Sequence, residues 1–468
     1  MLEVVAVAQH KTTKRLSLWS MIAFASPGLP ATLLIVPVFG ILPTYYSLNT
    51  KIGLAEIGTA FLIARIIDAL LDPLIGILSD RTRSRLGARL PWMIAGAVIA
   101  LPSGYFLFLP PADADIYYFF WSSFMVMVAW TLLSIPHGAW AAELSDDYDE
   151  RSRIFGWKSI LATAGSMSFF LLPLAVAPFT HSTEFQPPTM FALMGVLTVL
   201  LPATLVWAGI SQPRSQALGA GAVATTFSLK AVLRSVVANR PFLLFVGITT
   251  LAGVSMGMTT TLSFLYMQDY LGVGDYAFLL GMLPALVGIA STPLWLRLSK
   301  RIDKHRTWAI GLGLSAIVGL FILALPPGRD SLIALGVILT TMGALQGAGI
   351  ALPSAILADV ADYEKWKEKA NATGNYFALL TLLSKGTTAI GAAIALYLSD
   401  ALGYIPRARG GTGDYLALMT PFVIVPTVLT LLACVLIVRF PIDRRRHRLI
   451  MRRLEARDRQ AAAATAAP

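Results

Sequence analysis

The chain contains one polar segment twice, as Leu78-Ser-Asp-Arg-Thr-Arg-Ser-Arg85 followed by Trp92 and as Leu298-Ser-Lys-Arg-Ile-Asp-Lys-His305 followed by Trp308. A second pair of matching segments follows, again displaced by about 220 residues. Its copies read Pro136, Ala142-Glu143-Leu144, Asp147-Tyr148 and Pro353, Ala358-Asp359-Val360, Asp362-Tyr363. Two independent matches at one displacement predict a chain built of two homologous halves.

Long apolar stretches separate these polar segments. Hydrophobic residues make up 56% of the 468 residues and charged residues only 13%, whereas a typical soluble domain has about 25% charged residues. Because about 20 apolar residues cross the hydrocarbon core of a bilayer, we predict twelve membrane-spanning helices. They lie near residues 17–46, 54–79, 91–110, 115–144, 157–179, 188–210, 240–268, 275–298, 307–326, 331–360, 374–402 and 415–440. The predicted fold is an all-α membrane protein of two pseudo-symmetric six-helix halves, the major facilitator fold.

The basic residues predict how these helices are oriented. When Lys and Arg are assigned to alternate sides of the spans, 31 of the 37 fall on the side of both termini. The positive-inside rule then predicts a multi-pass protein of the cell (inner) membrane with cytoplasmic N- and C-termini. The first apolar run is too long for a cleavable signal peptide. The net charge of +11 is spread over five loops and two tails, so we expect the lipid bilayer as a partner and no nucleic acid.

The expected domain boundaries follow from the same pattern. The N-terminal half covers residues 1–211 and the C-terminal half residues 241–441. Between them, residues 212–240 form a cytoplasmic linker that we expect to contain a short amphipathic helix. Residues 442–468 form a basic tail that is expected at anionic lipid headgroups. The single cysteine excludes an intramolecular disulfide, and a monomer is expected.

Arg65, Asp68 and Asp72 lie within the second predicted span, where an ionisable side chain is costly unless it faces a partner or a cavity. Spacings of three and four place all three on one helical face. Two ionised carboxylates one turn apart repel each other, and a bound monovalent cation such as Na⁺ would relieve that repulsion through oxygen ligands. The alternative is a structural pair in which Arg65 neutralises one aspartate.

Lys385 is alone in the eleventh predicted span. An unpaired buried ammonium is expensive, so we expect it to contact Asp68 or Asp72 across the interface between the halves, or an anionic group of a substrate. Arg65 and Lys385 are therefore candidate coupling residues. The alternative for Lys385 is a side chain that snorkels to the membrane surface.

Prolines interrupt the first predicted span, which contains Ser26-Pro-Gly-Leu-Pro30. Such bends are tolerated only against protein or a water-filled cavity, so this helix is expected to line the transport pathway. His137 and Trp140 in the fourth span are further candidates for this lining. For His137, the alternative is a hydrogen-bonded packing role.

Charged clusters follow the fourth and tenth predicted spans. Their acidic and basic side chains are candidates for ion pairs that close the cytoplasmic side in one conformation, although a solvated charged face is the alternative. The candidate gate residues are Glu143, Asp147, Arg151, Asp359 and Asp362.

From Arg65 to Trp92 the sequence resembles the signature of the glycoside–pentoside–hexuronide:cation symporters. The stretch reads Arg65-Ile-Ile-Asp68-Ala-Leu-Leu-Asp72-Pro-Leu-Ile-Gly-Ile-Leu-Ser-Asp80-Arg-Thr-Arg-Ser-Arg85-Leu-Gly87, then Pro91-Trp92. The likeness continues through residues 136–151 and 359–367 to Lys385-Gly386, and so covers most of the chain.

This resemblance implies roles for individual residues. The cation-binding carboxylates of the family fall on Asp68 and Asp72, a threonine ligand falls on Thr131, and the family's lysine of span eleven falls on Lys385.

The resemblance also bears on the substrate site. A basic residue that contacts sugar falls on Lys158. Ser26 and Ser134 stand near or at the positions where the best-known member has sugar-binding aspartates. The cation machinery is thus retained and the sugar clamp is not, which favours uronates and other anions among the solutes.

These observations predict a cation-coupled (Na⁺ or H⁺) secondary symporter of a sugar, glycoside, uronate or other small polar solute, working by alternating access without a cofactor. A symporter of lysolipids or other amphipathic lipids is the alternative within the same fold. A non-transporting membrane sensor or a channel is a third hypothesis, although no soluble output domain or repeated filter loop is recognisable. No metal-ligand cluster, nucleophile elbow or phosphate loop indicates an enzyme.

Overall fold

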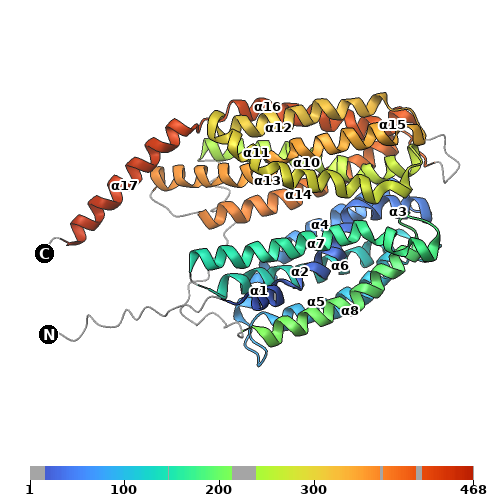
Figure 1. The fold of residues 1–468 in the computed structure, drawn as a ribbon, viewed down its shortest axis with the longest axis horizontal. Helices are drawn as coiled ribbons and strands as arrows, with labels where there is room; N and C mark the ends of the chain where they lie inside the picture. The colour runs from blue at the N-terminus through green and yellow to red at the C-terminus, as the bar shows by residue number, and fades with distance from the viewer. Residues whose placement is uncertain (1–15, 146, 213–238, 369–372, 407–413, 467–468) are drawn as a thin grey trace.

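A computed structural model describes residues 16–145, 147–212, 239–368, 373–406 and 414–466. Within these ranges all regular structure is helical (Figure 1). The two halves lie side by side, the N-terminal one drawn in blue to green and the C-terminal one in yellow to red. The first and last described helices begin at the same end of the molecule. We call this the terminal end and the opposite one the far end.

The N half contains six spans. Its helices are α1 (Leu18–Ala25), α2 (Gly28–Gly40), α3 (Leu42–Asn49), α4 (Leu54–Arg81), α5 (Leu90–Phe108), α6 (Ile116–Glu143), α7 (Tyr148–Thr180) and α8 (Pro187–Ser211). The first three are pieces of one interrupted span.

The C half repeats this arrangement. Its helices are α10 (Arg240–Leu265), α11 (Ala277–Ile302), α12 (Lys304–Gly319), α13 (Leu332–Glu368), α14 (Thr373–Ala401), α15 (Tyr415–Met419) and α16 (Val425–Val438), followed by the tail helix α17 (Arg444–Ala466). A π-helical turn, Thr420–Ile424, joins α15 to α16 in one span. The amphipathic helix expected in the linker falls on residues 213–238, outside the described ranges.

Eleven of the described helical stretches are long and apolar enough to cross a membrane. The twelfth span is α4, whose 28 residues suffice in length but whose middle carries Arg65, Asp68 and Asp72. The predicted all-α fold with twelve spanning helices is therefore confirmed.

Small residues allow α10 and α14 to pack closely. Gly253 and Gly257, one turn apart on α10, face α14, and a Cβ atom at Gly257 would overlap the carbonyl of Thr388. Gly391 of α14 lies in the same way against the carbonyl of Val254. Close approach through small residues is how membrane helices gain packing contacts that lipid cannot supply.

The buried apolar side chains show where the halves are joined. One cluster runs through the N half and, at the far end, includes residues of the C half such as Leu262, Phe264 and Leu396. A second cluster, with Phe242 and Trp308, is confined to the terminal end of the C half. The apolar core is thus continuous between the halves only toward the far end.

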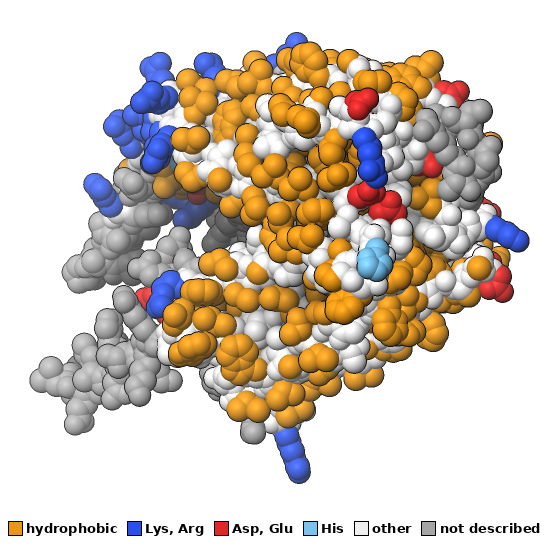
Figure 2. Space-filling model, turned by 45° about the vertical axis from the view of Figure 1, so that its right-hand side comes forward, with side chains coloured by type: hydrophobic (Ala, Val, Ile, Leu, Met, Phe, Trp, Pro, Cys, Tyr) orange, Lys and Arg blue, Asp and Glu red, His pale blue; other side chains and the backbone are white. Residues whose placement is uncertain are grey.

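Polar and aromatic contacts agree with this. The hydroxyl of Thr183 donates to the carbonyl of Asp275 at 2.7 Å, and Phe185 meets Phe264 edge to face, with ring centroids 5.7 Å apart. Both contacts join the two halves at the far end. The space-filling view shows the surface hollowed between the halves toward the terminal end (Figure 2). The structure is therefore closed at the far end and open at the terminal end.

The break between α1 and α2 has its own hydrogen-bond partners. Pro27 lacks the N–H that a helix would direct to the carbonyl of Ala23, and the hydroxyl of Ser26 donates to that carbonyl instead, at 2.9 Å. His137 Nε2 lies 2.8 Å from the carbonyl oxygen of Phe24. Because a carbonyl only accepts, Nε2 carries the proton. Two side chains thus replace helix hydrogen bonds that the bend removes.

Replacing Ser26 by alanine tests this account. The hydroxyl is buried, with Ser26 5% exposed, and its loss leaves the Ala23 carbonyl without its donor. We expect a loss of about 1–3 kcal/mol in the free energy of unfolding, seen as a melting temperature several degrees lower in detergent. Ser168→Ala is the matched control, because that hydroxyl bonds the Ala164 carbonyl inside the regular helix α7. Equal stability of the two variants would contradict the role given to Ser26.

Candidate functional site

The middle of α4 carries the charged side chains of the site. Asp68 is fully buried and Arg65 is 7% exposed. Arg65 Nη1 lies 2.9 Å from Asp68 Oδ2, one turn along the same helix. The guanidinium of Arg65 also stacks over the ring of Phe39, 4.7 Å from its centroid. The pair that the sequence analysis offered as a structural alternative is thus present.

Thr131 of α6 joins the two aspartates. Its Oγ1 lies 2.7 Å from Asp68 Oδ1 and 3.1 Å from Asp72 Oδ1. A hydroxyl has one proton and can donate it to only one carboxylate at a time. Two carboxylate oxygens and one hydroxyl oxygen, from two helices, thus lie close together. Oxygen ligands of this kind are the ones that a hard cation prefers.

Lys385 completes the cluster from the C half. Its Nζ, on α14, lies 2.5 Å from Asp72 Oδ2, so the expected contact across the interface exists. Each carboxylate thus uses Oδ2 for a basic side chain and Oδ1 for Thr131. Both Oδ1 atoms are thus within hydrogen-bond distance of one hydroxyl, while both Oδ2 atoms face a positive charge.

A cavity of about 250 Å³ adjoins this cluster between the halves. It is bounded by both basic side chains of the site, by two aromatic rings of the N half, and by small and hydroxyl-bearing residues of α10 and α14. The lining residues are Phe39, Phe61, Arg65, Gly257, Thr260, Thr261, Ser384, Lys385, Thr388, Ala389 and Ala392.

Lys158 lies elsewhere in the N half. Its Nζ is 3.3 Å from the position that a Cβ atom of Gly138 would occupy, so α7 directs the ammonium onto the small residue of α6. No acidic side chain of the described residues pairs with it. A half-buried ammonium without a carboxylate is a suitable counterion for a negatively charged solute.

A family model described as "MFS/sugar transport protein" matches residues 23–444. The chain belongs to this family. The protein is therefore a multi-pass membrane transporter of the major facilitator type and not an enzyme.

Curated relatives of similar length support this assignment. The chain is 24% identical to the "Uncharacterized symporter YnaJ" of Bacillus subtilis, covering 96% of this chain and 97% of the relative. It is 24% identical to the "Glucuronide carrier protein homolog" of Escherichia coli, over 88% and 90% of the two chains. It is 25% identical to the "Isoprimeverose transporter" of Lactiplantibacillus pentosus, over 87% and 86%.

Solved structures share the fold of this transporter. The nucleoside transporter NupG superposes with a TM-score of 0.65 at 11% identity, covering 90% of this chain and 98% of NupG. A bacterial homologue of the human lysosomal transporter Spinster gives a TM-score of 0.60 at 15% identity, over 93% and 96%.

The other predicted substrate residues of this transporter are placed around the bend of the first span. Ser26 and His137 form the hydrogen bonds described above, and Trp140 packs edge to face against Phe24, with centroids 5.7 Å apart. Ser134 is half-buried on α6. Ser26, His137 and Trp140 are thus engaged in shaping the span, and their contact with a substrate stays a prediction.

The gate residues of the N half pair within that half. Arg89 contacts Glu143 and Asp80, each at 2.5 Å. Asp147 caps the start of α7 by accepting the N–H of Glu150 at 2.8 Å. Arg151 donates to two backbone carbonyls, that of Ala142 in the last turn of α6 and that of Ser145 in the loop that follows.

The gate residues of the C half behave in the same way. Lys304 lies 2.7 Å from Asp359, which mirrors Arg89 and Glu143 in the other half. Asp362 lies 3.1 Å from His447 Nε2 of α17. In this conformation each described gate residue therefore has its described partner in its own half, and a gate between the halves remains a prediction for another conformation.

Sequence reasoning missed several residues of the cavity. Thr260 and Thr261 belong to a run of three threonines inside the apolar α10, and Ser384 and Thr388 flank Lys385 on α14. The threonine run could have indicated a cavity-lining position, because three consecutive hydroxyl groups are unusual in a lipid-facing segment.

Proposed function

We propose that this transporter is a symporter that couples a monovalent cation, Na⁺ or H⁺, to a small polar anion, with a uronate or related sugar acid as the leading class. The proposal rests on the shared contact of Asp68 and Asp72 with the Thr131 hydroxyl, with Lys385 held to Asp72 from the other half.

The contacts of Asp72 explain how binding of the cation and binding of the anionic solute can depend on each other. A cation that binds between the Oδ1 atoms and Thr131 weakens the hold of Asp72 on Lys385. The freed ammonium then lacks a partner, which costs up to about 3–5 kcal/mol for a fully buried charge and less here, because both side chains are nearly one-fifth exposed. An anionic solute in the adjoining cavity removes this cost. States with only one of the two ligands are therefore disfavoured, which is the thermodynamic requirement for co-transport.

The lining of the cavity supports the solute class. The wall contributes hydroxyl groups from Thr260, Thr261, Ser384 and Thr388 beside the Lys385 ammonium, which suits a polar solute better than the acyl chain of a lysolipid. One relative carries the name of a glucuronide carrier, and a glucuronide has a carboxylate.

The charge distribution of the loops supports the orientation. We propose that the protein resides in the cell (inner) membrane with the terminal end in the cytoplasm. The conformation described here is then the one open to the cytoplasm, and transport requires opening of the far end.

A melting-temperature screen of the purified protein tests this proposal, because a ligand that binds only the folded state stabilises it by mass action. At a concentration 100 times Kd the expected gain is about 2.7 kcal/mol. We expect a shift with Na⁺ that K⁺ at equal ionic strength does not give, and a further shift when glucuronate is added with Na⁺. For H⁺ coupling, the glucuronate shift instead depends on pH and not on Na⁺. A glucuronate shift that needs neither ion would contradict coupling, and stabilisation by neutral glycosides alone would contradict the anionic class.

A further inference from the structure

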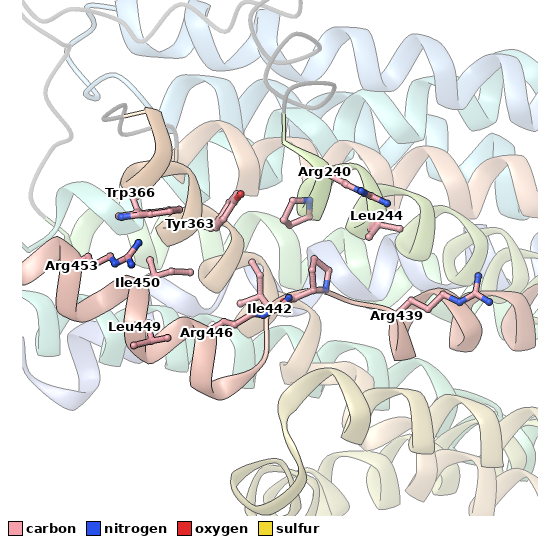
Figure 3. A pocket seen from close by; sticks show the side chains of 12 residues that line it. Arg240, Leu244, Tyr363, Trp366, Arg439, Ile442, Arg446, Leu449, Ile450 and Arg453 are labelled. Carbon is pink, nitrogen blue, oxygen red and sulfur yellow. The ribbon is translucent and has the colours of Figure 1, made fainter.

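A second pocket, of about 460 Å³, lies at the terminal end of the C half and shares no lining residue with the central cavity. It is formed where α10 begins, α13 ends and the chain passes from α16 into α17 (Figure 3). Its lining residues are Arg240, Pro241, Leu244, Tyr363, Trp366, Arg439, Pro441, Ile442, Arg446, Leu449, Ile450 and Arg453.

The pocket is strongly basic. Four of its twelve lining residues are arginines, and none is acidic. Arg446 is held by a hydrogen bond from Nη1 to the carbonyl of Pro441 at 2.6 Å, and Arg453 stacks over Trp366 at 5.5 Å. Arg240 and Arg439 pair with no acidic side chain of the described residues. Guanidinium groups that pair with no carboxylate favour a phosphate, whose oxygens an arginine can bind in pairs.

The pocket also has apolar lining residues, and exposed apolar side chains stand next to them in the sequence. Leu244 and Ile442 line the pocket. Next to the lining residues Leu244 and Arg439, the side chains of Leu243 and Val438 are 49% and 63% exposed on spanning helices. Inorganic phosphate has no apolar part that could contact these residues, whereas a phospholipid has both a phosphate and an acyl chain.

The segment that precedes Arg240 in the sequence does not supply an acidic occupant. Residues 213–238, which lead into Arg240, contain Arg214, Lys230 and Arg234 and neither Asp nor Glu. A basic segment is repelled from a basic pocket.

Contacts of the tail helix fix the wall of the pocket. His447 Nε2 lies 3.1 Å from Asp362 and 3.5 Å from Asp359, and Arg457 donates to the carbonyl of Lys365 at 3.2 Å. These contacts hold α17 against the end of α13, so its two lining arginines are positioned before any ligand arrives.

We propose that this pocket binds an anionic phospholipid of the adjacent leaflet, with the phosphate held by Arg240 and Arg439, which lie at the same end of the pocket (Figure 3), and one acyl chain along α10 and α16. Basic pockets between helices at this membrane surface suit anionic headgroups. Such a lipid ties the beginning of α10 to the end of α16. This site is independent of the cation and solute sites proposed above.

Native mass spectrometry of the full-length protein tests the proposal, after exchange into nanodiscs of phosphatidylcholine with increasing phosphatidylglycerol. We expect retained phosphatidylglycerol on the wild type and at least a tenfold weaker apparent affinity in Arg240→Gln/Arg439→Gln. Arg452→Gln is the matched control, because Arg452 is an exposed arginine of α17 that does not line the pocket. Unchanged binding in the double variant would overturn the site.

Two further measurements distinguish a bound lipid from general electrostatic attraction and from a soluble anion. Leu244→Trp fills the apolar part of the pocket without removing a charge and is also expected to lower lipid binding, which a purely electrostatic attraction to the surface would not show. Inorganic phosphate at millimolar concentration is the probe for a soluble ligand. If phosphate displaces the lipid completely and stabilises the protein alone, the occupant is a soluble anion and the lipid assignment is wrong. Equal melting temperatures in pure phosphatidylcholine verify that the variants are folded.

Discussion

Asp72→Asn is expected to reduce cation-driven solute accumulation by at least about 100-fold, while the folded protein remains in the membrane. The substitution removes one of the two carboxylates that contact Thr131 and breaks the 2.5 Å contact with Lys385. It leaves that ammonium without its partner, at a cost of up to about 3–5 kcal/mol for a fully buried pair and less here, because both side chains are nearly one-fifth exposed. Uptake into proteoliposomes under an imposed cation gradient measures the effect.

A double variant separates the loss of stability from the loss of coupling. Asp72→Asn/Lys385→Gln has no uncompensated charge, so its melting temperature is expected to recover toward that of the wild type, while accumulation stays lost. Asp330→Asn, at an exposed aspartate of the far end, is the control and should transport normally. Wild-type accumulation by Asp72→Asn would place the cation site elsewhere.

Gly58→Trp is expected to abolish transport by preventing closure of the far end. Gly58 of α4 faces α14 there, and a Cβ atom at this position would lie 3.1 Å from Leu396 Cβ and 3.4 Å from the carbonyl of Ala393. An indole cannot fit at this contact, so the halves must separate at the far end and the conformation shown in Figure 2 becomes inaccessible. The cation site lies further along α4 and is expected to remain intact. The variant should therefore still be stabilised by Na⁺, or show the pH-dependent stabilisation, in the melting-temperature measurement.

Labelling measures this change directly. In a Cys434→Ala background, Thr183→Cys places a thiol at the far-end contact with Asp275, although the substitution itself removes that hydrogen bond. A membrane-impermeant maleimide should label it several-fold faster when Gly58→Trp is also present. Gly195→Trp on α8 is the control, because no atom lies within 4 Å of a Cβ there. Equal labelling rates with and without Gly58→Trp would contradict the assignment of the far end as the closed one.

The residues of the site differ in how far the sequence could predict their contacts. Arg65, Asp68, Asp72 and Lys385 stand out because charge inside an apolar span is costly wherever the helix lies. Thr131 carries no such signal, and only the family resemblance indicated it.

Contacts that depend on the assembled fold could not be predicted. The partner of Glu143 is Arg89, which the sequence analysis did not consider because two spans, α5 and α6, and the loop between them separate the two residues. Ser26 and His137 received a substrate role from their position in the chain, whereas the structure commits both to carbonyls exposed by the bend at Pro27. The contact of Ser26 with the Ala23 carbonyl is local, with a spacing of three residues, whereas the contact of His137 with the Phe24 carbonyl depends on how two distant helices pack and is not encoded in local spacing.

The concentration of charge on α4 also bears on how the protein enters the membrane during synthesis. Each Arg or Asp at the centre of a helix raises the free energy of insertion by about 2.5–3.5 kcal/mol, whereas each Leu, Ile or Phe lowers it by only about 0.3–0.6 kcal/mol. With three such residues, α4 alone is expected to insert poorly through the translocon, even when Arg65 and Asp68 neutralise each other. Thr131 arrives two spans later and Lys385 nearly at the end of translation. The second span is therefore expected to settle into the bilayer only when later parts of the nascent chain have joined it, so that the ion site is also an assembly point.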